Sequence, residues 1–174
     1  MLQNRTFRIL LVLALVFANV GCDQISKKMA RTSIPQGQPP IPIIDDYFVL
    51  MNVENEGAFL SLGHDFSPLL KNILLLGLPI LMLVGALLYL FFQKDLSKIA
   101  LIGWSFFIGG GIGNMFDRIK YGSVTDFLFI DLGGIFRTGV FNMADVSIMV
   151  GMGFLILFYI QDSRKSMKEK APTE

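Results

Sequence analysis

Long apolar runs dominate the sequence and predict membrane-spanning helices. An α-helix rises about 1.5 Å per residue, so crossing a hydrocarbon core of about 30 Å takes roughly 20 residues. Three runs reach this length, at residues 69–92, 99–117 and 140–160. We therefore expect one span in each of them.

The run at 69–92 carries signals for its start and for an irregularity. Ser67 and Pro68 are typical of an N-cap and a first helical position. Gly77 and Pro79 lie inside the run. Because proline removes a backbone donor and crowds the preceding turn, this pair predicts a kink.

A shorter apolar run near the start of the chain allows two interpretations. Residues 9–22 number only 14 and include Asn19, which is the length of a signal-peptide core. In one interpretation Arg5 and Arg8 precede such a core, and Cys22 ends a lipoprotein cleavage site. In the other, the helix continues to residue 30 and forms a fourth span, with Asp23 and Lys27 one turn apart at the membrane surface. We favour the fourth span, because three later spans need no lipid anchor.

Four spans put both termini on one side of the membrane. Lysines and arginines number eight on that side and seven on the other, but several of the seven lie in a long loop or beside carboxylates, where the positive-inside rule is weak. We expect both termini in the cytoplasm of a bacterium, a charged, frayed tail at 161–174, and segments 31–67 and 118–139 on the outer side.

Two stretches of the outer segments are typical of β-strands, at 47–53 and 127–130. We expect them to form a small sheet on the mouth of the bundle. The predicted fold is a single membrane domain over 1–174, an all-α bundle of four transmembrane helices with a small extracytoplasmic β-rich region. Its first helix is expected at 9–30.

Composition narrows the class of protein and of chemistry. The chain is 53% hydrophobic and only 17% charged, with a formal net charge of +1, which argues for a membrane protein and against a nucleic-acid partner. One cysteine and one histidine cannot supply an intrachain disulfide or the usual ligands of a zinc site. Ser/His/Asp catalysis would need His64, which we interpret as an exposed loop residue. We expect no metal and no cofactor, and carboxylates remain as the candidate catalytic groups.

The polar residues of the spans gather at one end of the bundle. Ionisable groups at membrane depth usually face the bundle interior or a cavity. Asn114 and Asp117 share one face of the third span, and Asn142 and Asp145 share one face of the fourth. Given the alternating topology, we expect these polar stripes to meet near the outer leaflet.

Two carboxylates held together can perform acid–base chemistry. Their mutual repulsion keeps one proton on the pair, so one member can deprotonate water while the other polarises a peptide carbonyl. That pattern indicates metal-independent aspartic proteolysis. Spacing alone does not choose among the candidates, which are Asp23, Asp117, Asp126, Asp131 and Asp145.

Five short segments resemble the successive motifs of lipoprotein signal peptidase, also called signal peptidase II, in the family's order. They are Asp23-Gln24-Ile25-Ser26-Lys27, Asn55-Glu56-Gly57-Ala58-Phe59, Gly113-Asn114-Met115-Phe116-Asp117-Arg118, Val124-Thr125-Asp126-Phe127 and Phe141-Asn142-Met143-Ala144-Asp145. The resemblance covers nearly the whole chain. One departure is Arg137-Thr138-Gly139-Val140, where many members carry an aromatic residue or proline before the Phe-Asn motif.

The resemblance implies a role for each matching residue. Asp126 and Asp145 match the catalytic pair. The positions that shape the site or hold substrate are Asn55, Gly57, Asn114, Arg118 and Asn142, and those matching Asp23 and Lys27 are mainly structural. We also interpret Asp117 as structural. The implied substrate is a prolipoprotein whose cysteine carries a diacylglyceryl group, cut just before that cysteine.

A second hypothesis keeps the same aspartates but changes the function. A small proton-coupled carrier could use them as a relay, and it predicts polar side chains through the depth of the bilayer. For either function we expect a monomer in contact with membrane lipids.

Overall fold

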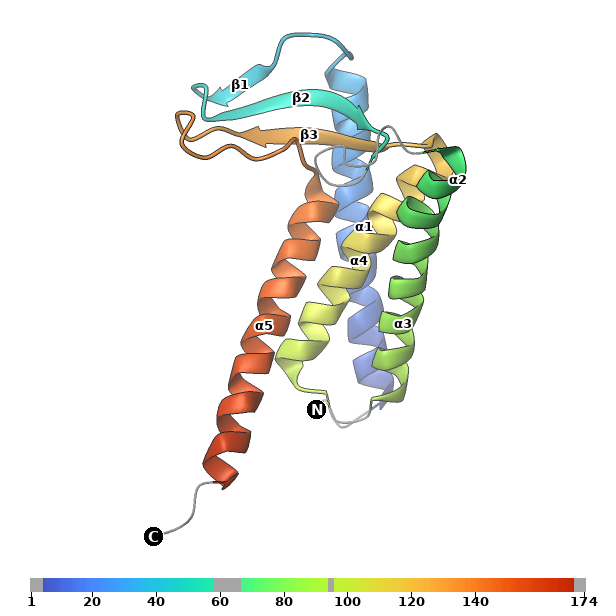
Figure 1. Ribbon diagram of the computed structural model, residues 1–174, viewed down its shortest axis with the longest axis vertical. Helices are drawn as coiled ribbons and strands as arrows, with labels where there is room; N and C mark the ends of the chain where they lie inside the picture. The colour runs from blue at the N-terminus through green and yellow to red at the C-terminus, as the bar shows by residue number, and fades with distance from the viewer. Residues whose placement is uncertain (1–4, 58–66, 94–95, 171–174) are drawn as a thin grey trace.

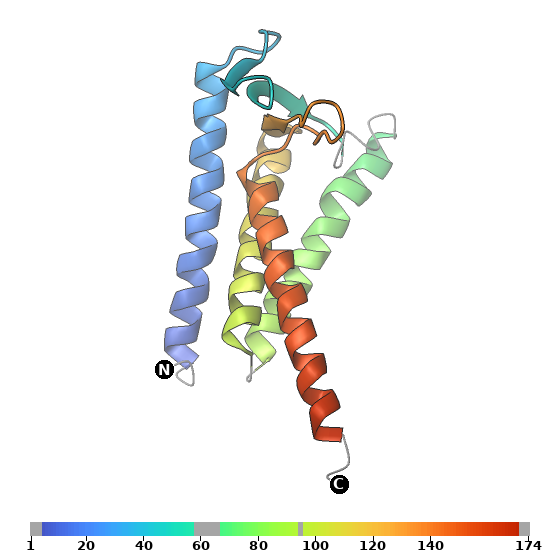
Figure 2. The same ribbon diagram turned by 90° about the vertical axis from the view of Figure 1, so that its left-hand side faces the viewer.

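The computed structural model describes residues 5–57, 67–93 and 96–170, and in these ranges four helices are long and apolar enough to cross a membrane (Figure 1). The helical elements are α1 (Arg5–Ser33), α2 (Pro68–Lys71), η2 (Asn72–Gly77), α3 (Leu78–Phe92), α4 (Lys98–Tyr121) and α5 (Met143–Lys170). The strands are β1 (Ile41–Ile44), β2 (Phe48–Asn55) and β3 (Val124–Ile130). The strands lie at one end of the bundle, and both ends of the chain lie at the other (Figures 1 and 2).

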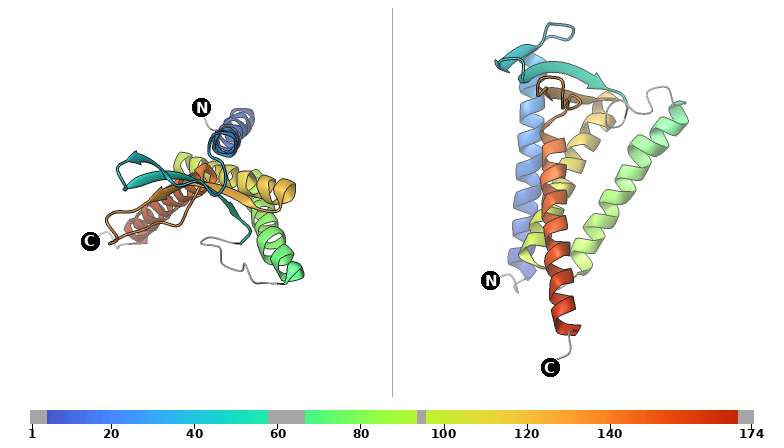
Figure 3. Two further views of the ribbon diagram at one scale, coloured as in Figure 1. Left: turned by 90° about the horizontal axis from the view of Figure 1, so that it is seen from above. Right: turned by 60° about the vertical axis from the view of Figure 1, so that its left-hand side comes forward.

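Helix α4 is the central and most buried span, with α1, α3 and α5 around it (Figure 3). Glycines on α4 let its neighbours approach closely. A Cβ atom at Gly109 would lie 2.7 Å from the Cβ of Asn19 on α1, and one at Gly110 would collide with the backbone oxygen of Ala144 on α5. Small residues at contact points are the usual way for membrane helices to pack tightly.

Helix α1 is continuous from Arg5 to Ser33, so the prediction of a first span is confirmed and its end lies three residues later than expected. Its buried face consists of Asn19, Asp23, Lys27 and Ala30. Positions three or four apart lie on the same side of a helix, which explains this pattern. Asp23 and Lys27, one turn apart as expected, are fully buried inside the bundle.

The span at 69–92 has the predicted start and the predicted irregularity. The backbone N–H of Leu70 donates to Ser67 Oγ (3.4 Å) and that of Lys71 to the Ser67 carbonyl (2.9 Å). Residues 72–77 form a π-helical turn, and Pro79 follows at the start of α3. A wider turn ahead of proline accommodates the lost backbone donor and the ring.

Helix α5 differs from the sequence prediction at both ends. It begins at Met143 rather than at 140, because Phe141 is bridged to Leu128 of β3 and is extended. It continues to Lys170 rather than ending at 160, so the expectation of a frayed tail is wrong for residues 161–170, and residues 171–174 lie outside the described residues. Residues 161–170 contain one apolar side chain, Met167, but seven of the ten are Gln, Arg, Lys, Met or Glu, which favour helix in solvent.

The three strands form an antiparallel sheet in the order β1-β2-β3. Strands were predicted at 47–53 and 127–130, and β2 and β3 confirm both. The edge strand β1 was not predicted, because its Pro42 and the neighbouring prolines favour loop. A cluster of Ala30, Ile34 and Phe127 packs the end of α1 against the sheet. His64 lies outside the described residues.

Candidate active site

The register of the sheet brings Asn55 to Asp126. Asn55 at the end of β2 pairs with Val124 of β3, and Asp126 lies two residues further along the same face of β3. Diagonal neighbours on one face of a sheet are within reach of each other's side chains. Asn55 Nδ2 donates to Asp126 Oδ2 at 2.9 Å, and Asn55 Oδ1 accepts from the Gly57 backbone N–H at 3.0 Å.

The start of helix α5 fixes Asp145. Asn142 is the residue before the helix, and its Oδ1 accepts from the Asp145 backbone N–H at 3.0 Å. In return, Asp145 Oδ2 accepts from the Asn142 backbone N–H at 3.0 Å. This reciprocal pair is a capping box, which satisfies backbone donors that a helix start leaves unpaired. The side chain of Asp145 is therefore held by the same bonds that begin the helix.

Asn142 also connects the two aspartates. Its Nδ2 donates to Asp126 Oδ1 at 2.6 Å, while its backbone N–H donates to Asp145 Oδ2. Both carboxylates thus accept hydrogen bonds from a single, fully buried residue. Strand β3 and helix α5 therefore contribute one carboxylate each to the same site.

Asn114 of α4 bonds with both Asp145 and Asn142. Its Nδ2 donates to Asp145 Oδ1 at 2.9 Å, and its Oδ1 accepts from Lys27 Nζ at 2.9 Å and from Asn142 Nδ2 at 3.1 Å. Because lysine only donates, the bond from Lys27 requires the amide oxygen of Asn114 to face it. The amide nitrogen is therefore directed at Asp145.

Arg118 bounds one side of the site, where its guanidinium binds a backbone carbonyl. Its Nη2 donates to the Gly57 carbonyl at 3.1 Å, and Gly57 is buried. Since Gly57 also donates to Asn55, this bond ties α4 to the end of β2. Ala58 and Phe59, the last residues of that motif, lie outside the described residues.

The two aspartates line one pocket of about 220 Å³. Its polar wall also contains Asn55, Asn114 and Arg118, and its apolar wall consists of Leu74, Leu75, Pro79, Val124 and Val140. The π-helical turn and Pro79 thus form part of the pocket. A pocket with an apolar wall and a few convergent polar groups is typical of a substrate site.

Burial changes the acidity of Asp126, which is only 3% exposed. Burial raises its pKa from 3.8 to about 6, and the negative charge of Asp145 acts in the same direction. Hydrogen bonds from Asn55 and Asn142 and the charge of Lys27 lower the pKa and limit the rise. Carboxyl groups that titrate near neutral pH are suited to acid–base catalysis.

A separate ionic cluster lies next to the pocket. Lys27 Nζ pairs with Asp23 Oδ2 at 2.9 Å and with Asp117 Oδ2 at 3.2 Å, and all three side chains are fully buried. Arg31 Nη2 pairs with Asp117 Oδ2 at 3.0 Å, and Arg31 Nε lies 3.9 Å from Glu54 Oε1. The structure thus places the three residues interpreted as structural in one network that joins α1, α4 and β2.

Sequence reasoning missed two members of this cluster, Arg31 and Glu54. Arg31 was assigned to a loop because the first helix was ended at residue 30. Its spacing of eight from Asp23 and four from Lys27 puts it on the buried face once the helix is extended. Glu54 gave no sequence signal, since its partners come from other elements: Thr125 Oγ1 donates to Glu54 Oε1 at 2.7 Å.

At the departure from the family motif, Arg137 Nε pairs with Asp131 Oδ2 at 2.7 Å beyond the pocket, and Val140 lines the pocket. The departure from the family motif at residues 137–140 therefore affects the rim of the pocket.

Comparison with known proteins agrees with the motifs. The family model described as signal peptidase (SPase) II matches residues 15–161. The lipoprotein signal peptidase of Pelodictyon phaeoclathratiforme is 36% identical over 156 residues, covering 86% of this chain and 89% of that protein. That of Borrelia hermsii is 34% identical over 155 residues, covering 87% and 90%.

A solved structure of a bacterial membrane enzyme, obtained by the in meso method, has the same fold. Its TM-score is 0.77 at 21% identity, with 94% of each chain covered. The family match extends from α1 into α5 and so includes every element that carries the pocket. From this match and from relatives of more than 30% identity along most of their length, the chain belongs to the signal peptidase II family.

Proposed function

We propose that this protein is an aspartic endopeptidase that removes the signal peptide from diacylglyceryl-modified prolipoproteins, cutting just before the lipidated cysteine. The observation that carries the proposal is the pocket in which Asn142 donates to both Asp126 and Asp145. The names of the relatives, lipoprotein signal peptidases, support the substrate class.

In the proposed reaction the pair shares one proton, which we assign to Asp126 because burial raises its pKa. Asp145 takes a proton from water, and the resulting hydroxide attacks the scissile carbonyl carbon. Asp126 donates a hydrogen bond to the carbonyl oxygen as charge develops there. The pair then returns a proton to the nitrogen, and the peptide C–N bond breaks.

The surrounding residues have supporting roles in this proposal. Asn55, Asn114 and Asn142 orient the two carboxylates through their amide groups. Arg118, which lines the pocket, and Gly57, which accepts its hydrogen bond, shape the rim and hold substrate. No step uses a metal ion, so we expect activity to survive a chelator.

The four apolar helices and the family make the chain a multi-pass protein of the bacterial inner membrane. We propose that both termini are cytoplasmic and that the sheet and the pocket face the outer leaflet. A lipidated cysteine at the end of a signal-peptide helix would then meet the carboxylates at the depth where water reaches them. Its acyl chains would lie against the apolar pocket wall and the helices beside it.

The decisive experiment uses the purified full chain and a diacylglyceryl-modified prolipoprotein. We expect Asp126→Asn and Asp145→Asn each to lower the cleavage rate by at least about 10³-fold, since general acid–base groups contribute roughly 10²–10⁴ each. Asp162→Asn, an exposed carboxylate on the far part of α5, is the matched control. Cleavage at the wild-type rate by either pocket variant would refute the assignment, and loss of activity in a chelator would refute metal independence.

The carrier hypothesis receives less support from the packing. Among the described residues of α4, the buried polar side chain outside the sheet end is Ser105, whose Oγ donates to the Leu101 carbonyl of its own helix at 2.8 Å. A relay through α4 would need further polar groups at that depth. Aspartate-dependent proton flux in proteoliposomes is the result that would favour a carrier.

A further inference from the structure

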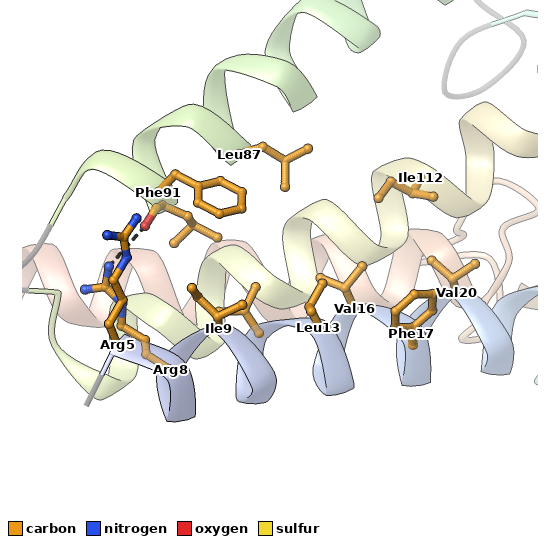
Figure 4. A pocket seen from close by; sticks show the side chains of 12 residues that line it. Arg5, Arg8, Ile9, Leu13, Val16, Phe17, Val20, Leu87, Phe91 and Ile112 are labelled. Carbon is orange, nitrogen blue, oxygen red and sulfur yellow. Dashed lines mark hydrogen bonds between the residues drawn. The ribbon is translucent and has the colours of Figure 1, made fainter. Parts of the chain in front are cut away.

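A second cavity of about 300 Å³ lies between α1 and α3, toward the end of the bundle that carries both termini. Its floor is Ile112 of α4, and its two walls come from α1 and α3 (Figure 4). Leu87 and Phe91 of α3 face Ile9 and Leu13 of α1 across it, as Figure 4 shows. Almost all of this surface is apolar.

Two arginines occupy one end of this groove. Arg5 and Arg8 line its mouth, whereas the rest of the lining is hydrocarbon (Figure 4). Arg8 Nη2 lies 3.5 Å from the Leu90 carbonyl on α3, so its guanidinium is held at the mouth between the two helices. An arginine presents several N–H donors in a planar fork that matches a phosphate.

This groove is separate from the active site. The pocket of Asp126 and Asp145 is bounded by η2 and the start of α3, by β3 and by the start of α5. The two cavities share no lining residue. The groove begins at Arg5 and Arg8 and reaches Ile112 on α4, whereas the active-site pocket begins at Asn114 on that helix. An occupant of the α1–α3 groove would therefore not contact the aspartates.

We propose that the groove between α1 and α3 binds one anionic phospholipid, with its phosphate at Arg5 and Arg8 and an acyl chain along the apolar walls. The groove is positively charged at one end and apolar along the rest, which matches an anionic head group followed by an acyl chain. The lining of α1 extends from Arg5 to Val20, about 22 Å along a helix at 1.5 Å per residue, which spans one leaflet of a hydrocarbon core of about 30 Å. A zwitterionic lipid would fit the walls equally but lacks the net charge that two arginines favour.

The test measures lipid retention by native mass spectrometry of the purified full chain. Dioleoylphosphatidylglycerol and dioleoylphosphatidylcholine are titrated separately, because they share acyl chains and differ in charge. We expect the first bound phosphatidylglycerol to be about tenfold tighter than phosphatidylcholine. We expect Arg5→Gln/Arg8→Gln to abolish this preference. The control Arg164→Gln/Lys165→Gln removes the same charge from the exposed end of α5 and should keep it.

A second pair of variants tests the apolar part without altering charge. Leu13→Trp fills the groove and should weaken binding of both lipids several-fold, whereas Leu10→Trp, on the exposed surface outside the groove, should not. Prolipoprotein cleavage by all four variants should stay at the wild-type level, which separates this site from the catalytic one. Equal retention of the two lipids by the wild type, or an unchanged preference in Arg5→Gln/Arg8→Gln, would overturn the proposal.

Discussion

Two groups of carboxylates lie side by side at the sheet end of the bundle, and the protein surrounds them differently. In the ionic cluster, Asp23 and Asp117 each pair with the ammonium of Lys27, and Asp117 also pairs with Arg31. In the pocket, Asp126 accepts from the side-chain amides of Asn55 and Asn142. Asp145 accepts from the Asn114 amide and a backbone N–H.

The contrast shows that one small bundle places neighbouring carboxylates in two different environments. In the ionic cluster, cations at contact distance tie the carboxylates into the structure. Amide donors orient the carboxylate of Asp126 without cancelling its charge, and burial raises the pKa of Asp126 to about 6. Lys27 belongs to both regions, because it also donates to Asn114.

The largest expected effect on stability comes from removing the cation that the cluster depends on. Lys27→Met leaves the fully buried Asp23 without its cationic partner, and breaking a buried ion pair costs about 3–5 kcal/mol. We expect the free energy of unfolding in detergent to fall by that order. The neighbouring Lys28→Met removes an exposed charge and should change it little.

A double variant separates lost charge from lost packing. Asp23→Asn added to Lys27→Met removes the uncompensated charge but keeps an oxygen for the Ala144 backbone N–H, which now donates to Asp23 Oδ1 at 2.9 Å. We expect part of the lost stability to return. If the double variant is less stable than Lys27→Met, the cluster is not held by charge pairing.

On the pocket side, Asn142 should matter more for activity than for stability. Asn142→Ala removes the bond to Asp126 and the cap of α5. Losing one aligned donor in an active site costs about 10²–10³-fold in rate, and losing a helix cap costs about 1 kcal/mol in stability. Cleavage kinetics and thermal unfolding of the same preparation measure both effects.

Asn142→Ser tests whether these two roles are separate. Serine at a helix N-cap still accepts from the backbone but is too short to reach Asp126 as the amide does. We therefore expect the stability to return and the activity to stay low. Recovery of both together would mean that Asn142 serves only as a cap.

Hydrophobic length was enough to predict three of the four spans, because crossing a bilayer imposes a minimum run on any helix. The apolar run of the first span is shorter, and that span was favoured because three later spans need no lipid anchor. The ends of the spans were harder to predict. Val140 and Phe141 are as apolar as a span, yet neither is helical, and Phe141 instead bonds with Leu128. The polar residues 161–170 continue the helix through propensity, which hydrophobicity does not report.

The site was predictable in composition but not in geometry. Polar stripes on two spans placed Asn114 and Asp145 near each other, whereas family resemblance selected both Asp126 and Asp145 from the candidate aspartates. The contact of Asp126 with Asn55 depends on the register between β2 and β3, which the sequence does not specify. The groove between α1 and α3 also escaped prediction, because it depends on which helices become neighbours around α4.

The raised pKa of Asp126 predicts a pH-dependent stability. A carboxyl with a folded-state pKa near 6 and an unfolded one near 3.8 binds its proton more tightly when folded. Its contribution to stability is complete below pH 3.8 and is lost as pH rises through 6. The groups that influence it are Asp145, which raises the pKa, and Lys27, which lowers it.

The measurement compares the wild type with Asp126→Asn at pH 4 and pH 8. We expect the free energy of unfolding of the wild type, relative to the variant, to be about 1–3 kcal/mol greater at pH 4, since one pKa unit corresponds to about 1.4 kcal/mol. Asp162→Asn, an exposed carboxylate, should show no such difference. An identical wild-type-to-variant difference at both pH values would mean that Asp126 is not protonated on folding.

The smallest expected effect concerns a neutral hydrogen bond just below the ionic cluster. Ser147 Oγ of α5 donates to Asn19 Oδ1 of α1 at 2.7 Å, and both residues are buried. Hydrogen bonds between membrane helices contribute about 0.6 kcal/mol on average, because the separated helices also find partners. We expect Ser147→Ala to lower the free energy of unfolding by that amount and to leave cleavage unchanged. A loss as large as that of Lys27→Met would show that neutral contacts, and not paired charges, hold α1 against the other helices.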